Sequence, residues 1–468
     1  MRVGIGLDFG TSNSAAAWFD GERLHSIVLE EGAAGPSPIL PTAVHLDREY
    51  RAQVGSRAIA QYVEENRGRR VELVATVIGE SASSVGGNEA GEDISRLHTE
   101  RHVVYGPPVD RTLPGRLFLG LKRLLGDPEI ERLSVFDRQY RLVALLTPIL
   151  QHMREGIGRV CAAPLLPIHV GRPVHFEGRH PGRDAVAASR LAEALGHAGL
   201  PLAQFGSEPV AATLSWGWRV RPPRGALALT VDFGGGTLDL SLIRHDDTRF
   251  EVLATKGLAL GGDRIDQLIF ESMLFPQLGQ GESWVRPVDG REVNTLFPFG
   301  EFEAGLVNWP TTFLLNQNRT RFMVADRLAR GGPGGEKFQR LLDLISYNYS
   351  YNCFAAIKRA KAALSTVEAT VIDIPELNLR LPFTRRQLDV ILQPVLASLR
   401  AAIGEVLDAA GRRADEVDVA IRTGGTSEIV AVRNLLEELF PGRVVGHEPF
   451  TSVASGLAIA NFRGQALA

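Results

Sequence analysis

The pattern of apolar and polar positions contains one internal repeat, whose two copies lie nearly half of the 468-residue chain apart. Residues 3–7 form a short apolar run that ends at Asp8 and is followed by a turn with glycine and hydroxyl residues. Residues 229–231 form a similar run that ends at Asp232 and is followed by three glycines. A second apolar run follows each turn, so both segments predict a β-hairpin. A single repeat at this spacing predicts two similar lobes rather than a solenoid.

The remaining segments alternate helical periodicity with short apolar strands, which is typical of α/β proteins. Proline and glycine at 221–225 mark the expected boundary between the lobes. Thr384 is the expected N-cap of one helix. Segments 66–110 and 276–336 resemble insertions into the lobes; the first is rich in arginine, glycine and serine, and the second is loop-like and aromatic. Helices are expected at 142–160, 181–196, 208–216, 338–364, 385–410, 429–440 and 452–462, and strands at 165–170 and 417–421.

Length and composition then exclude several classes of protein. A chain of this length is expected to form two or more folding units. Its net charge of −3 offers no basic surplus for a nucleic-acid backbone. We expect no membrane span, because the apolar stretches are short. We expect no secretory leader, because the first residues lead directly into a strand. The expected location is therefore the cytoplasm. Cys161 and Cys353 are too few for a disulfide framework or a zinc site.

The turns of the two predicted hairpins carry groups suited to a phosphate ligand. Glycine lets backbone N–H groups approach a ligand closely, and successive amides in such turns form a concavity that binds anions. Neighbouring hydroxyl residues add hydrogen-bond donors. We therefore expect both turns to bind phosphate. The residues are Gly10, Thr11, Ser12 and Asn13 in the first turn and Gly234, Gly235, Gly236 and Thr237 in the second.

Three carboxylates accompany these turns, namely Asp8, Asp232 and Asp239. A carboxylate beside a phosphate repels the ligand unless a cation lies between them. Because Mg²⁺ gives up its water reluctantly, we interpret the three as holding Mg²⁺ mostly through water. The alternative is that Asp-Phe-Gly is only a hairpin turn, and the hydroxyls at matching positions in both hairpins favour the metal site.

A third glycine turn, Gly424–Gly425, follows the strand expected at 417–421. A Gly-Gly pair alone is common at tight structural turns, and that interpretation stays open. After two phosphate hairpins, the turn also fits the nucleoside end of the same ligand. The ligand would then be a nucleotide.

Taken in order, these motifs resemble the ATPase domain of the seventy-kilodalton heat-shock chaperones, the DnaK-type branch of the actin-like fold. The resemblance implies an α/β, ribonuclease H-like fold with two lobes, each split into two subdomains, around a nucleotide cleft. Lobe I would span 1–221, with an upper subdomain at about 40–120. Lobe II would span 222–468, with an enlarged upper subdomain at about 263–383 and a last helix returning towards lobe I. The matching segments are residues 8–14, 207–212, 232–241, 260–266, 358–365, 423–427 and 448–456.

The resemblance also implies catalytic roles for four residues. Lys122 aligns with the family's catalytic lysine, which stabilises the transferring phosphoryl group; a solvated lysine on an amphipathic helix is the alternative. Glu208 aligns with the carboxylate that positions Mg²⁺ through water; the alternative is a glutamate that favours a helix start. Thr237 would contact the γ-phosphate and the attacking water, and Asp232 would orient that water.

The adenosine site departs from the family's pattern. The family's two adenine-stacking arginines fall at Ala362 and Glu428, and its ribose-contacting glutamate falls at Lys358. One hypothesis is an inverted charge pair between Lys358 and Glu428 across the nucleoside cleft; unrelated surface changes are the alternative. Phe450 stands where the family usually has aspartate. The expected nucleoside contacts are Lys358, Lys361, Ser365, Gly424, Gly425, Thr426 and Glu428.

These features predict a Mg²⁺-dependent ATPase of the heat-shock protein 70 type that binds ATP and ADP. The family's chaperones continue into a client-binding region, whereas this sequence ends at Ala468, so it resembles the short YegD-like subgroup. A protein partner or co-chaperone would then respond to the nucleotide state. The alternatives are a small-molecule kinase of the same superfamily, an actin-like filament ATPase and a nucleotide-binding pseudoenzyme.

Overall fold

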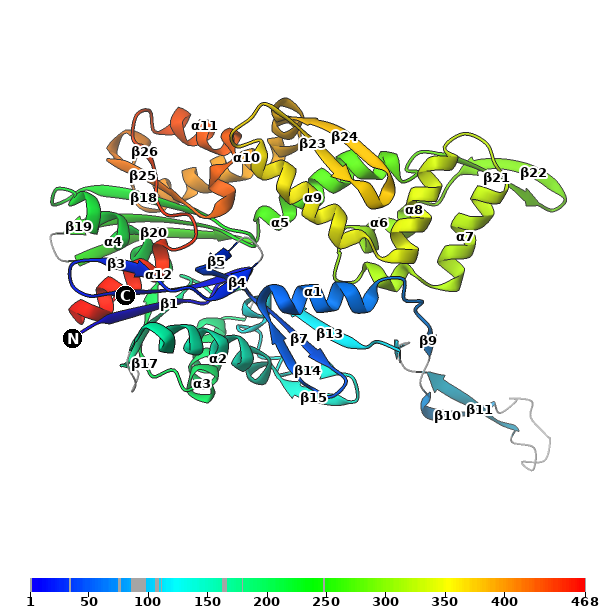
Figure 1. Ribbon diagram of the computed structural model, residues 1–468, viewed down its shortest axis with the longest axis horizontal. Helices are drawn as coiled ribbons and strands as arrows, with labels where there is room; N and C mark the ends of the chain where they lie inside the picture. The colour runs from blue at the N-terminus through cyan, green and yellow to red at the C-terminus, as the bar shows by residue number, and fades with distance from the viewer. Residues whose placement is uncertain are drawn as a thin grey trace, which may run out of the picture.

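Two mixed β-sheets form the centre of the structure, a computed structural model (Figure 1). It describes residues 2–32, 35–74, 77–85, 98–105, 109–110, 112–161, 166–178, 180–246 and 249–467. The first sheet has the order β17-β16-β1-β2-β3, and β6 pairs with β2. Its strands are β1 (Gly4–Asp8), β2 (Asn13–Phe19), β3 (Leu24–Ser26), β6 (Ile39–Pro41), β16 (Ile168–Arg172) and β17 (Leu202–Ser207).

The second sheet repeats the central arrangement of the first. Its order is β20-β19-β18-β25-β26. In each sheet an antiparallel hairpin, β1–β2 or β18–β19, has a parallel strand beside its first member, β16 or β25. Both predicted hairpins are therefore confirmed, and their turns lie at corresponding positions. The strands are β18 (Leu227–Phe233), β19 (Leu238–Asp246), β20 (Arg249–Leu258), β25 (Val419–Thr423) and β26 (Val444–Gly446).

Two helices, α4 (Glu208–Val220) and α12 (Ser452–Arg463), lie where the two sheets meet. They pack against each other; α12 also covers β1, β2 and β16, and α4 also contacts β18 and β19. Small residues allow this close packing. A Cβ at Gly6 would lie 2.1 Å from the Ala454 carbonyl oxygen, and one at Gly456 would lie 1.8 Å from that of Ala211. The helix predicted near the C-terminus is thus confirmed and joins the two sheets.

The other elements surround the sheets, and the predicted helices among them are confirmed with small shifts at their ends. Thr384 caps α10 as expected, because its Oγ1 accepts a hydrogen bond from the Gln387 amide at 3.3 Å. The helices are α1 (Gly55–Asn66), α2 (Leu142–Val160), α3 (Arg183–His197), α5 (Gly262–Ile269), α10 (Arg385–Ala409) and α11 (Val430–Leu439). The small sheets contain β4 (Glu30–Gly32), β5 (Gly35–Ser37), β7 (Ala43–Asp47), β8 (Ala52–Val54), β13 (Gly115–Leu119), β14 (Arg132–Val135), β15 (Arg138–Arg141), β23 (Ala369–Ile374) and β24 (Leu379–Thr384).

Two expectations about the segment after α5 are wrong. The helix expected at 338–364 is two helices, α8 (Gly335–Tyr347) and α9 (Ser350–Ala363), because Asn348 adopts a left-handed conformation with φ of 55°. Segment 276–336 is also not loop-like. Its aromatic residues, such as Phe302, pack into the same hydrophobic core as Phe338. Their spacing along the sequence has no clear helical or strand period, which is why the segment resembled a loop. The segment contains β21 (Ser283–Val288), β22 (Arg291–Leu296), α6 (Gly300–Leu306), η4 (Thr312–Leu315) and α7 (Asn318–Ala329).

The expected insertion at 66–110 contains two strand pairs in its described part. They are β9 (Leu73–Val74) with β12 (Val109–Asp110), and β10 (Val77–Val85) with β11 (His98–Tyr105). Residues 86–97 of this insertion lie outside the described residues. The strand expected at 165–170 begins at Ile168, and residue 165 also lies outside them.

Helix α10 is long and apolar enough to cross a membrane by length and composition, which the sequence had not led us to expect. Its packing shows a different use. Leu392, Leu399 and Ile403 belong to the hydrophobic core, and the helix lies against β19, β20 and α11. We therefore interpret α10 as a core helix of the second sheet.

Helix α1, which lies apart from α4 and α12 in Figure 1, contacts η4 and so joins the parts of the molecule that hold the two central sheets a second time. The Tyr62 hydroxyl of α1 donates a hydrogen bond to the Pro310 carbonyl, and the Val71 amide donates one to the Asn316 carbonyl at 3.0 Å. Tyr62, Val71 and Phe313 form a small buried apolar cluster. We call these five residues the α1–η4 contact.

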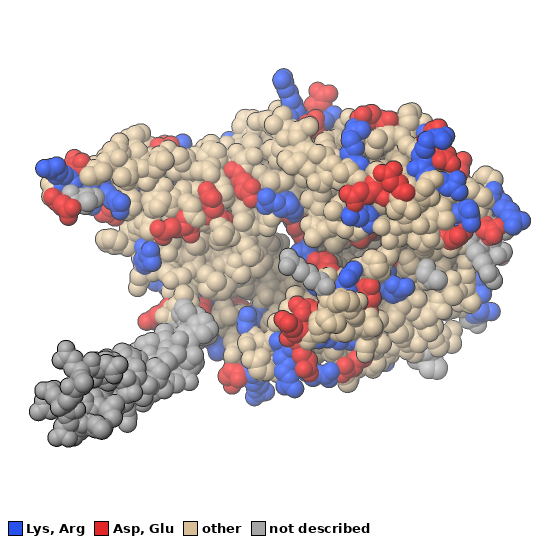
Figure 2. Space-filling model, turned by 180° about the vertical axis from the view of Figure 1, so that it is seen from behind, with Lys and Arg blue, Asp and Glu red and all other residues tan. Residues whose placement is uncertain are grey.

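Charged side chains of both signs are interspersed on the face drawn in Figure 2. The same view has a hollow between the upper and lower parts of the molecule. Neither sign dominates the part of this face that the structure describes, in keeping with the net charge of −3.

Candidate functional site

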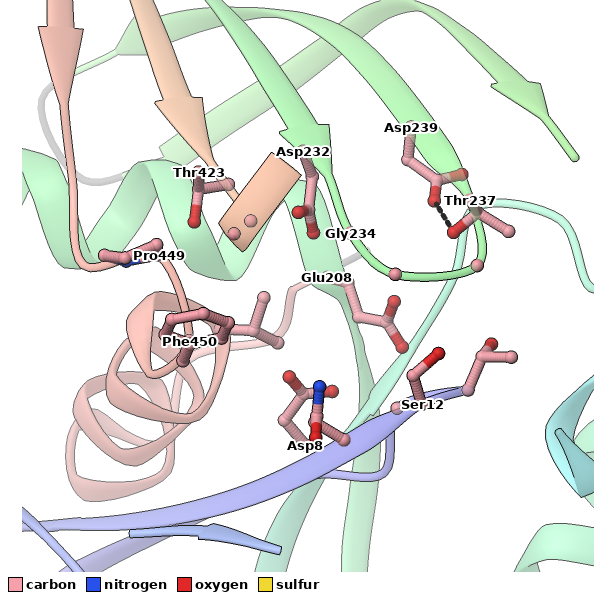
Figure 3. A pocket seen from close by; sticks show the side chains of 18 of the residues that line it. Asp8, Ser12, Glu208, Asp232, Gly234, Thr237, Asp239, Thr423, Pro449 and Phe450 are labelled. Atoms are coloured by element: carbon pink, nitrogen blue, oxygen red, sulfur yellow. Dashed lines mark hydrogen bonds between the residues drawn. The ribbon is translucent and has the colours of Figure 1, made fainter. Parts of the chain in front are cut away.

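A pocket lies between the β1–β2 turn and the β18–β19 turn (Figure 3). The space between the turns amounts to about 710 Å³, which includes open solvent at the mouth of the pocket. The pocket gathers most of the predicted site residues. The lining residues are Asp8, Gly10, Thr11, Ser12, Asn13, Lys122, Glu208, Asp232, Gly234, Gly235, Gly236, Thr237, Asp239, Thr423, Gly424, Gly425, Pro449, Phe450, Ser452 and Val453.

The two hairpin turns face each other closely across this pocket. A Cβ at Gly235 would lie 2.8 Å from the Ser12 Oγ, and one at Gly236 would lie 3.1 Å from the Thr11 Cγ2. A Cβ at Gly10 would collide with its own hairpin, 1.9 Å from the Asn13 carbonyl oxygen. Glycine is therefore required at Gly10, and at Gly235 and Gly236 a larger residue would have to displace a side chain of the facing segment. The absence of side chains leaves backbone N–H groups accessible from both turns.

Four acidic side chains converge below the turns, and the sheet register explains their convergence. Asp8 ends β1, Asp232 lies next to the end of β18, and Asp239 is its cross-strand partner on β19. Glu208 is the first residue of α4. Figure 3 shows Asp8, Glu208, Asp232 and Asp239 around the same space. Thr237 joins this group, because its Oγ1 donates a hydrogen bond to Asp239 Oδ2 at 2.8 Å.

Lys122 is the one basic side chain among the described residues that line this pocket. It lies in η1 (Leu121–Leu124), a short turn rather than the amphipathic helix considered from sequence. Its Nζ lies 2.7 Å from Glu208 Oε1, and its side chain is only 8% exposed. Burial alone would lower the pKa of Lys122, but the charges of Glu208 and Asp8 outweigh it and raise that pKa. The lysine is therefore held as a buried cation.

The pKa values of the three aspartates in this group, Asp8, Asp232 and Asp239, are raised above their ordinary value. Burial raises the pKa of Asp8 to about 7, and the Glu208 charge adds to this effect while Lys122 opposes it. Burial likewise raises the pKa of Asp239 to about 6, against the hydrogen bond from Thr237. Burial and the charges of Asp239 and Asp8 raise the pKa of Asp232 well above its usual value. One lysine does not neutralise this cluster.

This surplus of buried negative charge fits a divalent cation. Among the described residues, no three acidic, histidine or cysteine side chains are close enough to hold a metal by themselves. Asp8, Asp232 and Asp239 would thus suit Mg²⁺ that keeps much of its water and takes further oxygen ligands from a phosphate. The donor set is all oxygen, as Mg²⁺ prefers.

We predict that the ligand-free protein becomes less stable as pH rises from about 4 to about 7. The pKa of Asp8 is raised from 3.8 to about 7 in the folded state, so the folded protein keeps a proton that the unfolded chain has lost. The contribution of this proton to the free energy of unfolding is fully present below the pKa of Asp8 in the unfolded chain, 3.8, and it is lost as pH rises through the folded-state pKa of about 7. Thermal unfolding of the parent and of Asp8→Asn at pH 5 and pH 8 measures it. The variant should have a flatter pH dependence, and identical profiles would contradict the assignment.

The third glycine turn borders the same pocket. Gly424 has φ of 79°, and a Cβ there would lie 2.3 Å from the Phe233 carbonyl oxygen. The following η7 (Gly425–Glu428) is tied to the second hairpin, because Thr426 Oγ1 donates to the Gly234 carbonyl at 2.8 Å. The turn is therefore placed beside the two glycine hairpins, and glycine is structurally required at Gly424.

The expected nucleoside contacts divide into two groups. Gly424 and Gly425 line the pocket, whereas the remaining ones do not. Lys361 is engaged elsewhere, with its Nζ 2.6 Å from Asp266 Oδ1. The residues outside the pocket are Lys358, Lys361, Ser365, Thr426 and Glu428.

The hypothesis of an inverted charge pair between Lys358 and Glu428 is wrong in this structure. Glu428 Oε1 lies 2.5 Å from Arg422 Nη1, and Lys358 Nζ lies 3.4 Å from Asp263 Oδ1. Glu428 therefore pairs with Arg422 and Lys358 pairs with Asp263, so neither charge is available for the other.

Sequence reasoning missed four pocket residues, namely Pro449, Phe450, Ser452 and Val453, and it placed Thr423 only within the matching segment 423–427 without naming it as a contact. Segment 448–456 was recognised as a motif, and Phe450 was noted as a departure, but neither signal indicated a ligand contact. The hydrogen bonds between the Gly424 amide and the Pro449 carbonyl, 3.0 Å, and between the hydroxyls of Thr423 and Ser452, 2.8 Å, bring this segment to the pocket.

Comparisons with known proteins agree with this arrangement. Residues 124–277 match the family model described as Hsp70 protein. The chain is 26% identical to the "Chaperone protein DnaK" of Thermus thermophilus, over 98% of this chain and 60% of that protein. It is 23% identical to the DnaK of Nitrosopumilus maritimus, over 97% and 55%, and 25% identical to the "Chaperone protein HscA homolog" of Bordetella petrii, over 98% and 57%. The chain thus spans somewhat under two thirds of the length of these relatives.

Matches to these relatives extend over nearly the whole chain. The structure brings both hairpin turns, Lys122 and the Gly424–Gly425 turn together at one pocket. The chain is similar to the heat-shock protein 70 (Hsp70) family, by the family model over residues 124–277 and by these relatives over nearly its whole length.

Proposed function

We propose that this protein is a cytoplasmic, Mg²⁺-dependent ATPase of the Hsp70 type with the actin-like fold of that family. One observation carries the proposal. Two glycine hairpins, one from each central sheet, face each other across a cluster of four partly buried carboxylates and one buried lysine. Such a site combines amide donors for a polyphosphate with charge that suits a cation between phosphate and protein.

In this proposal, the backbone N–H groups of both turns bind the phosphates, and Thr237 contacts the γ-phosphate. Mg²⁺, when bound, would neutralise phosphate charge. Lys122 would stabilise charge that develops on the transferring phosphoryl group. Glu208 keeps Lys122 in place through their ion pair, and Asp232 would orient the attacking water from its buried position. Because burial and the neighbouring carboxylates raise the pKa of Asp232, its carboxylate is a stronger base once it is ionised, as acceptance of a proton from that water requires.

The consequence of hydrolysis would be a change in the angle between the two halves. The two halves are joined through α4 and α12 at one place and through the α1–η4 contact at another. A ligand bound between the hairpins can therefore alter how far the two halves close on each other. A protein partner or co-chaperone would respond to this change. The relatives named DnaK and HscA are chaperones by name, and a chaperone-like role for this chain is part of the proposal.

The experiment that tests the proposal is calorimetric titration with ATP, ADP and GTP, each with and without Mg²⁺. We expect ADP binding that is at least tenfold tighter with Mg²⁺, because the ion offsets repulsion between phosphate and the acidic cluster. Asp8→Asn and Asp239→Asn should reduce this Mg²⁺ dependence. Absence of binding under all conditions would contradict the proposal.

A second candidate, a small-molecule kinase, is favoured by a smaller pocket beside Lys122. This pocket of about 320 Å³ is lined by Pro173, His175, Phe176 and Glu177 together with the hairpin residues. His175 Nδ1 lies 2.9 Å from Asp184 Oδ2, as in a base oriented by a carboxylate. ATP consumption that depends on glycerol, a sugar or a carboxylic acid would favour the kinase, and consumption with water alone would favour the ATPase.

A further inference from the structure

Phe450 is an exposed aromatic residue in a pocket otherwise lined by glycine, polar and small side chains. Of the described residues that line this pocket, Phe450 alone has an aromatic ring. It is 45% exposed, although large apolar side chains in the chain are mostly buried. An apolar ring left open to solvent inside a ligand pocket is typical of a surface that a ligand covers.

The backbone around Phe450 is held in place from several sides. The preceding residue, Pro449, accepts a hydrogen bond from the Gly424 amide at 3.0 Å. The following residues enter α12, where the Ser452 hydroxyl lies 2.8 Å from that of Thr423. The ring therefore starts from a fixed position and not from a free loop.

The ring lies against the third glycine turn. A Cβ at Gly425 would be 2.7 Å from Phe450 Cζ, so glycine at this position makes room for the ring. Figure 3 shows Phe450 on the side of the pocket away from Thr237 and Asp239. A nucleotide with its terminal phosphates at the hairpins would extend its nucleoside towards this side.

The positions that carry stacking arginines in related chaperones offer no comparable surface here. Ala362 has no flat face, and Glu428 is turned to Arg422 at 2.5 Å. A planar base at this end of the pocket would lack a partner unless another group supplied one. Aromatic rings stack on nucleobases, and such stacking tolerates different bases because every base has a π-face.

We propose that Phe450 stacks on the nucleobase of the bound nucleotide and so determines base selectivity. The inference rests on the proposed nucleotide site. The strength of stacking depends on the area of the base more than on the groups at its edge. The site therefore binds purine nucleotides more tightly than pyrimidine nucleotides, and it discriminates weakly between adenine and guanine. Phe450 thus takes over a task that a pair of arginines performs in the related chaperones.

The test compares the parent with Phe450→Ala and Phe450→Trp by calorimetric titration in the presence of Mg²⁺. The probes are ADP, GDP, CDP and inorganic pyrophosphate, which has no base. We expect Phe450→Ala to weaken ADP and GDP about tenfold, to affect CDP less, and to leave pyrophosphate unchanged. Phe450→Trp should bind ADP as tightly as the parent or more tightly. The matched control is Phe322→Ala, which removes a phenylalanine that is 73% exposed on α7, outside the pocket.

Three results would overturn the proposal. Unchanged or tighter ADP binding by Phe450→Ala would mean that the ring does not contact the base or blocks it. An equal loss for pyrophosphate and ADP would assign Phe450 a purely structural role. Parent protein that binds pyrophosphate but not ADP would overturn the stacking inference alone, whereas binding of neither would overturn the proposed function as well.

Discussion

Replacing Lys122 with alanine is expected to slow ATP hydrolysis about 100-fold or more while ADP still binds. Lys122 is the buried cation of the pocket, and its Nζ lies 2.7 Å from Glu208 Oε1. Charge that develops on the transferring phosphoryl group would lose its nearest protein cation. Single-turnover hydrolysis at saturating ATP measures the chemical step, and titration with ADP measures binding separately.

The matched control for this prediction is Lys256→Ala. Lys256 pairs with Glu405 at 2.7 Å between partly exposed side chains, and such pairs contribute little. Hydrolysis and ADP binding should both stay at the parent level in this variant. If Lys122→Ala hydrolysed ATP at the parent rate, Lys122 would have no part in the chemistry. Loss of ADP binding together with hydrolysis would instead assign Lys122 to the charge balance of the ligand-free pocket.

Replacing Phe313 with alanine is expected to speed ADP dissociation about tenfold. Phe313 belongs to the α1–η4 contact, which joins the two halves away from α4 and α12. Removing a buried phenylalanine side chain generally costs about 3–5 kcal/mol, and about 1.4 kcal/mol lost from closure is enough for a tenfold change. Rapid mixing of a fluorescent ADP complex with excess unlabelled ADP measures the dissociation rate.

Two controls accompany this variant. Leu314→Ala changes the neighbouring residue, which is exposed and outside the buried cluster, and should leave dissociation unchanged. Single-turnover hydrolysis by Phe313→Ala should remain near the parent rate, because the hairpins and Lys122 are intact. An unchanged dissociation rate in Phe313→Ala would mean that the α1–η4 contact does not keep the pocket closed.

The phosphate side of the site could be predicted from the sequence because its groups lie within short turns. Gly10 is required by a distance inside its own hairpin, and Asp8 and Asp232 follow directly from the strands before them. The nucleoside side could not be predicted in the same way. Lys361, expected there, is engaged by Asp266, and Phe450 reaches the pocket from a segment that the third glycine turn holds.

Long aromatic segments show the same limit at the level of the fold. The sequence around Phe302 and Phe338 has no clear period, because these rings pack with partners from several elements. A single left-handed residue, Asn348, divides one expected helix into two. Such features depend on contacts between elements, so the local pattern of apolar and polar residues does not predict them.

By itself, the sequence determined two hairpins with glycine turns and a carboxylate at the end of each first strand, since turn and strand preferences act over a few neighbouring residues. Only the tertiary structure decided that Lys122 is buried against Glu208, that Glu428 turns to Arg422, and that Phe450 enters the pocket. The physical reason is that burial and ion pairing depend on which distant segments meet, and packing of the two sheets through α4 and α12 sets those meetings.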